Sequence, residues 1–274
     1  MERTPELLAQ MVAATVRALT PRSGRVRPSA GDGSRRDRGK MWAVAATSEH
    51  PRSIRSFVTR TGRITAAQQR ALAALWPKYG VEFAARPLEL RTLFGRAAPC
   101  TLEIGFGNGE NLLTLAAAHP ERDFLGIEVH RPGVGRLLLG LEARSLGNVR
   151  VICHDAVEVL EQQIAPESLA EILILFPDPW PKKRHHKRRL IQPPFAEILA
   201  SRLCRAGVLR LATDWEPYAL QMLEVLSAVR ALENLAADRA FSERPRERAP
   251  TRFERRGERL GHAVWDLLFR RGLS

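Results

Sequence analysis

The chain has few cysteines and no long apolar run. Its three cysteines, Cys100, Cys153 and Cys204, are odd in number and widely spaced, which predicts neither a disulfide framework nor a zinc site. Free thiols are typical of the reducing cytoplasm. No apolar stretch approaches the ~18 residues that span a bilayer, so we expect no membrane span. The cysteine pattern and the short apolar runs together lead us to expect a cytoplasmic protein without a bound metal.

Acidic residues are too few to balance the basic ones. The 43 lysines and arginines exceed the 30 aspartates and glutamates, so the formal net charge is +13 and the pI is near 10.9. Strongly basic proteins attract polyanions with an affinity that falls as salt rises. An arginine bias in the base composition of the genome would produce the same excess. The charge therefore favours a nucleic-acid partner but does not establish one.

The first fifty residues differ from the rest. Residues 4–20 carry apolar side chains at helical spacing, whereas residues 21–40 lack large apolar side chains and are predicted to be disordered. Alternatively, Met41 is the true start and the preceding residues come from a mis-called gene. We expect residues 1–50 to be a disordered or mis-called extension and residues 51–274 to form the functional domain.

Strand and helix patterns alternate from Cys100 onward. A helix with Thr65 as its N-cap is expected before them, over residues 66–75. The strands are predicted at 101–104, 124–129, 149–153, 172–176 and 208–213, and the helices at 110–118, 134–146 and 217–229. Such alternation is typical of an α/β protein with a doubly wound, mostly parallel sheet. Residues 262–269 are expected to add a final antiparallel edge strand.

A glycine-rich turn follows the first of these strands. Gly105, Gly107 and Gly109 allow close approach of a ligand and backbone conformations closed to other residues. A nicotinamide fingerprint requires a third glycine at position 110, but Glu110 stands there and is a poor neighbour for a pyrophosphate at a helix N-terminus. The spacing suits a cationic, phosphate-free ligand such as S-adenosylmethionine. The alternative is a structural turn without a ligand.

An acidic residue lies at the end of each of three successive strands. Glu103 precedes the glycine turn, where it would meet the ammonium group of such a ligand. Glu128 ends the next strand, where a carboxylate can accept both ribose hydroxyls, and Asp155 follows the third, near the expected adenine amine. Three acids in this pattern favour a ligand site over a purely structural turn.

Residues 176–189 are the most informative segment. Asp178 lies between Pro177 and Pro179, which stiffen the turn after a buried strand. Trp180 offers a stacking surface, and residues 182–189 carry six positive charges and two histidines. A fixed acid, a ring and a cationic run indicate chemistry on a nucleobase within a polyanion. The alternative is a basic surface turn that only solubilises the protein.

Together these segments resemble the bacterial tRNA (guanine-N7-)-methyltransferases, which are class I S-adenosylmethionine-dependent enzymes. The similarity runs from about residue 54 to 270 and leaves the first 45 or so residues unmatched. It rests on residues 55–65, 76–80, 102–110, 126–130, 175–189, 211–215 and 251–262. The Phe-Pro-Asp-Pro-Trp and Thr-x-Phe-Glu-x-Arg-Gly segments are specific to this family, whereas many methyltransferases have the glycine turn.

The resemblance implies a fold, a reaction and partners. The fold would be a doubly wound, mostly parallel, seven-stranded sheet of the Rossmann-like class I methyltransferase type, with an antiparallel edge strand. The cofactor would be S-adenosyl-L-methionine and the substrate a guanosine in tRNA, at position 46 in the variable loop. No metal and no membrane would be involved. Monomer and homodimer remain equally open.

The resemblance also implies site residues. Asp178 would be catalytic. The residues lining the cofactor would be Glu103, Gly105, Gly107, Glu128, Asp155 and Asp178. Those holding the target guanosine would be Lys182, Asp214, Thr251, Arg252, Phe253 and Glu254. Those contacting the RNA would be Arg184, His185, His186, Lys187, Arg188 and Arg189.

Elementary chemistry limits these roles. Guanine N7 carries a free lone pair and no proton, so its attack on a sulfonium methyl group needs positioning and no general base. Asp178 is therefore expected to accept hydrogen bonds from guanine or from the cofactor's ammonium group. Asp214 has a second interpretation as the N-cap of the next helix. Thr251 and Glu254 have capping-box spacing and thus a purely structural alternative as well.

Two other functions compete with this one. A methyltransferase acting on an exocyclic base amine has an Asp/Asn-Pro-Pro-aromatic loop at the same strand end, but here only Pro179 separates Asp178 from Trp180. An RNA-binding module with a vestigial cofactor fold is the second alternative, and the acids at all cofactor positions argue against it.

Overall fold

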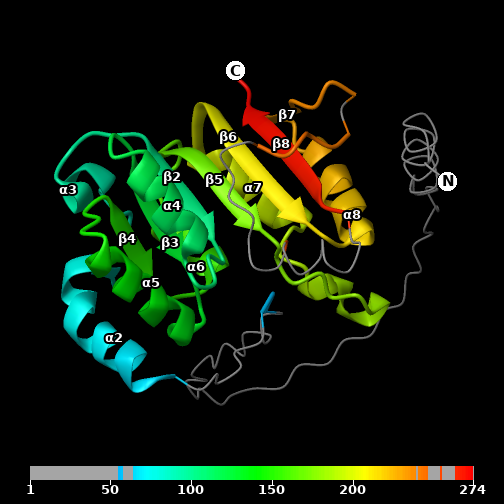
Figure 1. The fold of residues 1–274 in the computed structure, drawn as a ribbon. Helices are drawn as coiled ribbons and strands as arrows, with labels where there is room; N and C mark the ends of the chain where they lie inside the picture. The colour runs from blue at the N-terminus through cyan, green and yellow to red at the C-terminus, as the bar shows by residue number, and fades with distance from the viewer. Residues whose placement is uncertain (1–54, 58–63, 239, 246–253, 255–262, 274) are drawn as a thin grey trace, which may run out of the picture. The chain divides into compact units, whose positions relative to one another are not determined.

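A computed structural model describes residues 55–57, 64–238, 240–245, 254 and 263–273 (Figure 1). These residues belong to the unit Arg55–Ser274, so the expected extension over residues 1–50 lies outside them. The helices are α2 (Ala66–Tyr79), α3 (Leu90–Phe94), α4 (Glu110–Ala118), α5 (Arg131–Ala143), α6 (Ala156–Gln162), the 3₁₀ helix η1 (Lys183–Arg188), α7 (Pro193–Arg202) and α8 (Glu216–Ser227). The strands are β1 (Gly80–Val81), β2 (Cys100–Ile104), β3 (Asp123–Ile127), β4 (Val149–Ile152), β5 (Leu169–Leu175), β6 (Leu203–Thr213), β7 (Leu232–Asn234) and β8 (Trp265–Arg271).

The strands form one mostly parallel sheet in the order β1-β4-β3-β2-β5-β6-β8-β7. This confirms the expected α/β fold. The sheet has eight strands where seven were expected, because the two-residue β1 pairs in parallel with β4 at Gly80 and Val151. The expected antiparallel strand is β8, which pairs with β6. The short β7 covers its outer side, so β8 is the second strand from that edge.

Helices cover both faces of the sheet. On one face, α2, α4 and α5 enclose a cluster that includes Tyr79, Leu112 and Leu138. On the other, α6, α7 and α8 enclose a larger cluster that includes Leu160, Leu199 and Leu226. Figure 1 shows this layered arrangement. Because parallel strands are buried from both sides, β2 and β3 are buried along their whole length.

Several element boundaries differ from those expected. Thr65 is the N-cap of α2, as predicted, and forms a capping box with Gln68. The helix continues past residue 75 to Tyr79 with Pro77 inside its last turn, and the Gly80 N–H bonds to the Trp76 carbonyl. Sequence patterns missed α3, α6, η1, α7, β1 and β7, all of which except α7 have seven residues or fewer. Among the described residues, no helix is long and apolar enough to cross a bilayer.

Candidate active site

The sheet order brings the predicted acids to one edge. Strands β4, β3, β2, β5 and β6 are parallel neighbours, so their carboxyl ends lie along the same edge. The acids at or after these ends follow in the order Asp155, Glu128, Glu103, Asp178 and Asp214. From β2 the chain adds β3 and β4 on one side and later β5 and β6 on the other, so the strand order reverses between β2 and β5, which is where open α/β sheets bind ligands. The five acids therefore border a single candidate site.

The glycine turn between β2 and α4 leaves its backbone open. Gly105, Gly107 and Gly109 have φ values of 72°, 58° and 77°, in the left-handed region that disfavours side chains. A Cβ atom on Gly105 or Gly107 would meet nothing within 4 Å. The space that a side chain would fill is thus left to a ligand lying against the backbone. Gly109 instead packs on Leu137, where a Cβ atom would lie 2.6 Å from Cδ1.

Glu103 is a buried acid beside this turn. Its side chain is 3% exposed, and its Oε2 accepts a hydrogen bond of 3.0 Å from Asn111 Nδ2. Burial raises the pKa of Glu103 to about 7, which the bond from Asn111 opposes and the charge of Glu128 supports. A buried carboxylate of this kind would be stabilised by a cationic group. Glu103 therefore suits the ammonium group of an amino-acid moiety.

Glu128 has a structural role that sequence reasoning missed. Its Oε2 accepts a 2.9 Å bond from the Gly107 N–H, and its Oε1 accepts bonds of 2.7 and 2.9 Å from the Val129 and His130 N–H groups. The carboxylate thereby fixes the glycine turn to the end of β3. A carboxylate has about four lone-pair sites, so capacity remains for a ribose hydroxyl. A substitution of Glu128 would therefore disturb the glycine turn and the binding of a ligand together.

Asp155 is also the N-cap of α6. Its Oδ1 accepts a 3.0 Å bond from the Val157 N–H, and burial is the main cause of the raised pKa of Asp155. Beside it, the His154 ring stacks flat on Phe83 with 3.9 Å between ring centroids. His154 also bonds to Glu158 over 2.6 Å. The two stacked rings form a flat wall next to Asp155.

The Pro-Asp-Pro turn at the end of β5 is held in an uncommon backbone conformation. Phe176 and Trp180, on either side of it, have φ values of 53° and 43°. Non-glycine residues in this region cost of order 1–3 kcal/mol each and persist where surrounding contacts fix them. The Phe176 N–H bonds to the Ala212 carbonyl over 2.8 Å, and Trp180 Nε1 bonds to the Ser56 carbonyl over 3.0 Å. Asp178, between them, is exposed.

The basic segment after this turn forms the short helix η1. Lys182, Arg184 and Lys187 are exposed, and a phosphate contact requires this exposure of Arg184 and Lys187. The Arg188 guanidinium lies 4.0 Å above the Trp180 ring centroid, and it donates bonds of 3.3 Å to the carbonyls of residues 55 and 57. It therefore braces the turn while remaining partly exposed.

Two histidines complete this segment. His185 meets the Trp180 ring edge-on with 5.8 Å between centroids. Partial desolvation, followed by the surrounding cations, lowers the pKa of His185, so its ring is neutral near pH 7. His186 is partly exposed, and its carbonyl accepts a 2.9 Å bond from Gln192. The neutral His185 ring can therefore act as a hydrogen-bonding group.

Arg189 does not fit the expected RNA contact. Its side chain is only 3% exposed, and Nε donates a 2.8 Å bond to the Pro179 carbonyl. A buried guanidinium cannot reach a phosphate on the surface. The prediction for Arg189 is corrected accordingly. The sequence offered no signal to separate this arginine from the five basic residues before it.

The expected guanosine-binding residues are only partly described. Asp214 directly follows β6 and is half-buried. Its alternative role as an N-cap is wrong, because the N-cap of α8 is Trp215, which has no side-chain cap bond. Glu254 is 1% exposed and forms an ion pair of 3.1 Å with Arg244. Thr251, Arg252 and Phe253 lie outside the described residues, as does the expected capping box.

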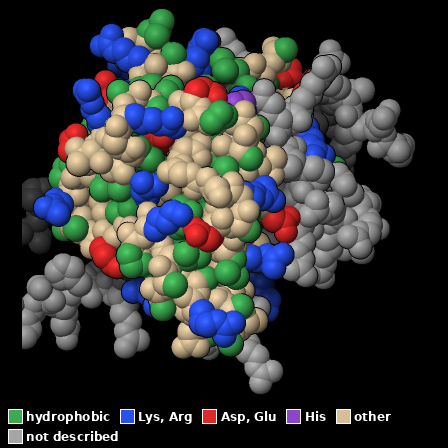
Figure 2. Space-filling view, turned by 60° about the vertical axis from the view of Figure 1, so that its left-hand side comes forward, with side chains coloured by type: hydrophobic (Ala, Val, Ile, Leu, Met, Phe, Trp, Pro, Cys, Tyr) green, Lys and Arg blue, Asp and Glu red, His purple; other side chains and the backbone are tan. Residues whose placement is uncertain are grey.

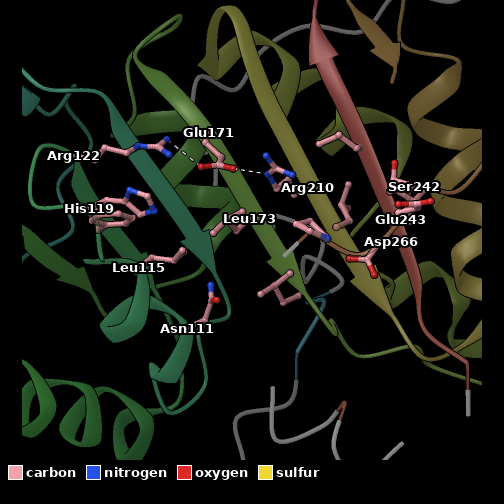
Figure 3. A pocket seen from close by; sticks show the side chains of 16 residues that line it. Asn111, Leu115, His119, Arg122, Glu171, Leu173, Arg210, Ser242, Glu243 and Asp266 are labelled. Carbon is pink, nitrogen blue, oxygen red and sulfur yellow. Dashed lines mark hydrogen bonds and ion pairs between the residues drawn. The ribbon is translucent and has the colours of Figure 1, made fainter. Parts of the chain in front are cut away.

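A hollow over strands β5, β6 and β8 is distinct from this strand-end site (Figure 3). At its centre, Glu171 is paired with Arg122 over 3.0 Å and with Arg210 over 2.7 Å. The carboxylate at the centre of the hollow is thus already paired with two guanidinium groups. Asn111 borders the hollow and also bonds to Glu103, so this residue is shared by the hollow and the strand-end site. We do not assign the chemistry to it.

Basic side chains do not gather in one patch on the face drawn in Figure 2. On the face drawn in Figure 2, lysine and arginine side chains are scattered with acidic groups between them. The continuous run over residues 182–189 is therefore a more specific signal for a polyanion than the net charge. Among the described residues, no group of three or more histidine, cysteine or acidic side chains is arranged to hold a metal ion.

Comparisons with known proteins agree with the geometry. The model of the family described as "Putative methyltransferase" matches residues 97–267. A tRNA (guanine-N(7)-)-methyltransferase of Methylococcus capsulatus is 58% identical over 231 residues, which cover 84% of this chain and 100% of that protein. Proteins of the same name from Leifsonia xyli and Photorhabdus laumondii are 60% and 56% identical, and the matches cover 79% and 80% of this chain and 95% and 92% of those proteins. This chain therefore belongs to the tRNA (guanine-N7-)-methyltransferase family of S-adenosylmethionine-dependent enzymes.

Proposed function

We propose that this protein transfers a methyl group from S-adenosyl-L-methionine to N7 of a guanosine in the variable loop of tRNA. The observation that carries the proposal is the row of five acids along one sheet edge, next to a glycine turn with open space above its backbone. The names of the relatives support the tRNA substrate and the N7 atom. The variable loop is the finer part of the proposal, and it rests on the family resemblance.

Each cofactor-binding residue is assigned to one part of the ligand. When bound, S-adenosylmethionine supplies an activated methyl group on a sulfonium. Glu103 would hold its ammonium group, Glu128 its ribose and Asp155 its adenine amine, while the open backbone at Gly105 and Gly107 accommodates the chain between them. The fit is chemical: two carboxylates are buried or nearly so, and both glycines lack neighbours where a side chain would stand.

Asp178 would act on the base. As N7 bonds to the methyl carbon, the purine becomes cationic, and a nearby carboxylate stabilises the charge that develops. The prolines on either side hold the carboxylate in place before the substrate arrives. No proton has to leave N7, so the enzyme needs no general base, and alignment supplies most of the acceleration. Asp178 would also accept hydrogen bonds from guanine or from the cofactor's ammonium group.

The remaining residues would hold the nucleic acid. We assign the target guanosine to Lys182, Asp214, Thr251, Arg252, Phe253 and Glu254. The flanking phosphates are assigned to Arg184, His185, His186, Lys187 and Arg188. Phosphate contacts fix the register of the RNA and contribute no base specificity. Whether one chain or two make this surface does not alter these assignments.

Transcripts with single-base changes test the position of the methyl group. Unmodified tRNA and a variant with adenosine in place of the variable-loop guanosine are each incubated with the enzyme and labelled cofactor. We expect label only in the first, in the variable-loop fragment after nuclease digestion. Equal labelling of both transcripts would refute the variable-loop assignment while leaving N7 methylation intact.

The pKa of Glu103 predicts how cofactor affinity depends on pH. With a pKa of about 7 in the free protein, the acid is largely neutral below that pH and cannot pair with an ammonium group. The dissociation constant for the cofactor should therefore rise by about tenfold per pH unit below 7. Titration calorimetry at several pH values measures it. The matched variant Glu103→Gln should bind weakly throughout and lose this dependence, and an unchanged slope in the variant would exclude Glu103 as its source.

The same shift affects stability in a defined direction. Because the folded pKa of Glu103 is raised from 4.5 to about 7, its contribution favours folding below pH 4.5 and is lost as the pH rises through 7. The free energy of unfolding of the parent should thus fall relative to that of Glu103→Gln over this window.

Neutralising exposed charges of the basic segment should weaken tRNA binding specifically. In Arg184→Ala/Lys187→Ala, the slope of log affinity against log salt should decrease by about one per lost phosphate contact. Cofactor affinity should not change. The control is the exposed pair Arg136→Ala/Arg144→Ala on and after α5. If both double variants retain the parental slope, the segment is an ordinary solvated surface.

Removal of residues 1–40 should leave methylation of tRNA unchanged at saturating substrate. Residues 55–57, in contrast, supply carbonyl acceptors to Trp180 and Arg188, so a deletion through residue 60 should lower turnover. Steady-state kinetics of the two truncated proteins give the comparison. Loss of turnover in the shorter deletion would show that the extension belongs to the enzyme.

A further inference from the structure

We propose that Arg189 is a positioning residue that holds the Asp178 turn against helix α8, and that it makes no contact with RNA. The inference rests on the proposed function, because it assumes that Asp178 and Asp214 act on the same substrate. It concerns a residue that the sequence pattern groups with the RNA-binding run. Its evidence is the set of contacts made by one buried guanidinium.

The guanidinium of Arg189 joins two segments that border the site. Nε donates a 2.8 Å bond to the Pro179 carbonyl, the residue directly after Asp178. Nη1 donates to Gln221 Oε1 and, over 3.4 Å, to the Pro217 carbonyl, both on α8. Helix α8 begins two residues after Asp214. One planar side chain therefore connects the Asp178 turn with the element that follows Asp214.

Neighbouring contacts reinforce the same junction. The Arg189 guanidinium lies 4.9 Å from the centroid of the Tyr218 ring. The Tyr218 hydroxyl accepts a 3.1 Å bond from the Ile191 N–H, and Gln221 Nε2 donates a 3.2 Å bond to the Ile191 carbonyl. The backbone at Ile191 is thus tied to α8 by both side chains. The end of the basic segment is fixed, whereas Lys182, Arg184 and Lys187 remain at the surface.

The buried guanidinium of Arg189 is held by acceptors that carry no charge. The acceptors on Pro179, Pro217 and Gln221 are uncharged, and burial lowers the pKa of Arg189. A buried cation costs free energy unless its surroundings compensate. Burial is the main cause of the raised pKa of Tyr218, the ring against which the guanidinium lies, and the nearby charge of Asp178 adds to it. The bond from Nε to the Pro179 carbonyl therefore places a fixed positive charge in the same turn as Asp178.

Arginine is required here because of its shape. Its rigid fork donates in several directions within one plane, whereas a lysine ammonium group is a compact point charge. Arg189→Lys keeps the charge but cannot reach the Pro179 and α8 acceptors together. Small displacements of aligned groups can lower turnover by about 100-fold. We expect kcat for tRNA methylation to fall by about 10- to 100-fold in Arg189→Lys, with KM for tRNA and cofactor within about twofold of the parent.

Salt dependence separates positioning from phosphate contact. The slope of log tRNA affinity against log salt should be parental in Arg189→Lys and in Arg189→Met, because the side chain is buried. The comparison variant Lys187→Ala should lower that slope by about one. The matched control Arg205→Met changes an exposed arginine at the opposite end of β6, and it should keep parental kcat and slope.

A second variant tests the same positioning role in case the Arg189 variants do not fold. Gln221→Leu removes one acceptor of the fork and leaves every charge in place, and it should lower kcat by about threefold to tenfold without changing the salt slope. Parental kcat in both Arg189→Lys and Gln221→Leu would overturn the positioning role. A salt slope that is reduced in Arg189→Met as much as in Lys187→Ala would also overturn this role. If the parent enzyme itself does not methylate tRNA, the proposed function fails, which is a separate outcome.

Discussion

Asp178→Ala should lower kcat for tRNA methylation by about 100- to 1,000-fold, the range found when one preorganised group that stabilises transition-state charge is removed. The reason is that Asp178 is held by two prolines at the point where the strand order reverses, and we propose that a positive charge develops on the base there. Single-turnover kinetics with saturating tRNA and cofactor measure this step directly.

The variant should remain folded, which makes the loss interpretable. Asp178 is exposed, and exposed substitutions usually change the free energy of unfolding by less than about 0.5 kcal/mol. Asp178→Asn should fall between parent and alanine, because its amide oxygen still accepts but carries no charge. Asp238→Ala, at another exposed aspartate, is the control and should keep parental kcat. Near-parental turnover in Asp178→Ala would remove this residue from the active site.

Gly133→Ala should abolish high-affinity cofactor binding although the change lies outside the glycine turn. A Cβ atom on Gly133 would lie 2.1 Å from the Gly107 carbonyl oxygen, a backbone atom that cannot move without displacing the turn. Within a helix, alanine is normally favoured over glycine by about 1 kcal/mol, so the expected destabilisation is a purely steric effect. Overpacking of this kind costs about 1–3 kcal/mol.

A second glycine provides the matched control for this prediction. A Cβ atom on Gly147 would meet nothing within 4 Å, so Gly147→Ala should leave both stability and binding unchanged. Thermal unfolding and cofactor titration of the two variants give the comparison. We expect at least a tenfold loss of cofactor affinity in Gly133→Ala. Parental affinity in that variant would show that the turn accommodates the methyl group.

The sequence was sufficient to predict the main strands along the chain and the acids at their ends. Glu103, Glu128, Asp155 and Asp178 lie next to apolar runs that can only be buried strands, and parallel strands bring their carboxyl ends together. Thr65 was predicted as a cap because threonine is favoured at the residue before a helix, and the structure adds its capping box with Gln68. Local spacing of this kind is readable without a structure.

Contacts between distant segments were not predictable in this way. Glu128 binds the backbone of Gly107, and Arg189 binds Gln221, and neither pair has a characteristic spacing. Arg189 and Lys187 look alike in sequence, yet one is buried and the other exposed. The extra strand β1 escaped detection because two residues are too few to form a pattern. The pairing partner β4 makes it a strand, and that partner is about 70 residues away.

The central claim is transfer of a methyl group from S-adenosylmethionine to guanine N7 in tRNA. Its most direct test is incubation of the full chain with unmodified tRNA and methyl-labelled cofactor, followed by digestion to nucleosides and mass spectrometry against standards. We predict labelled 7-methylguanosine, and none when the tRNA contains 7-deazaguanosine, which lacks the nucleophilic nitrogen. A label on an exocyclic amine would instead establish the competing amine methyltransferase. Binding of tRNA without any transfer, under conditions where the cofactor also binds, would contradict the claim altogether.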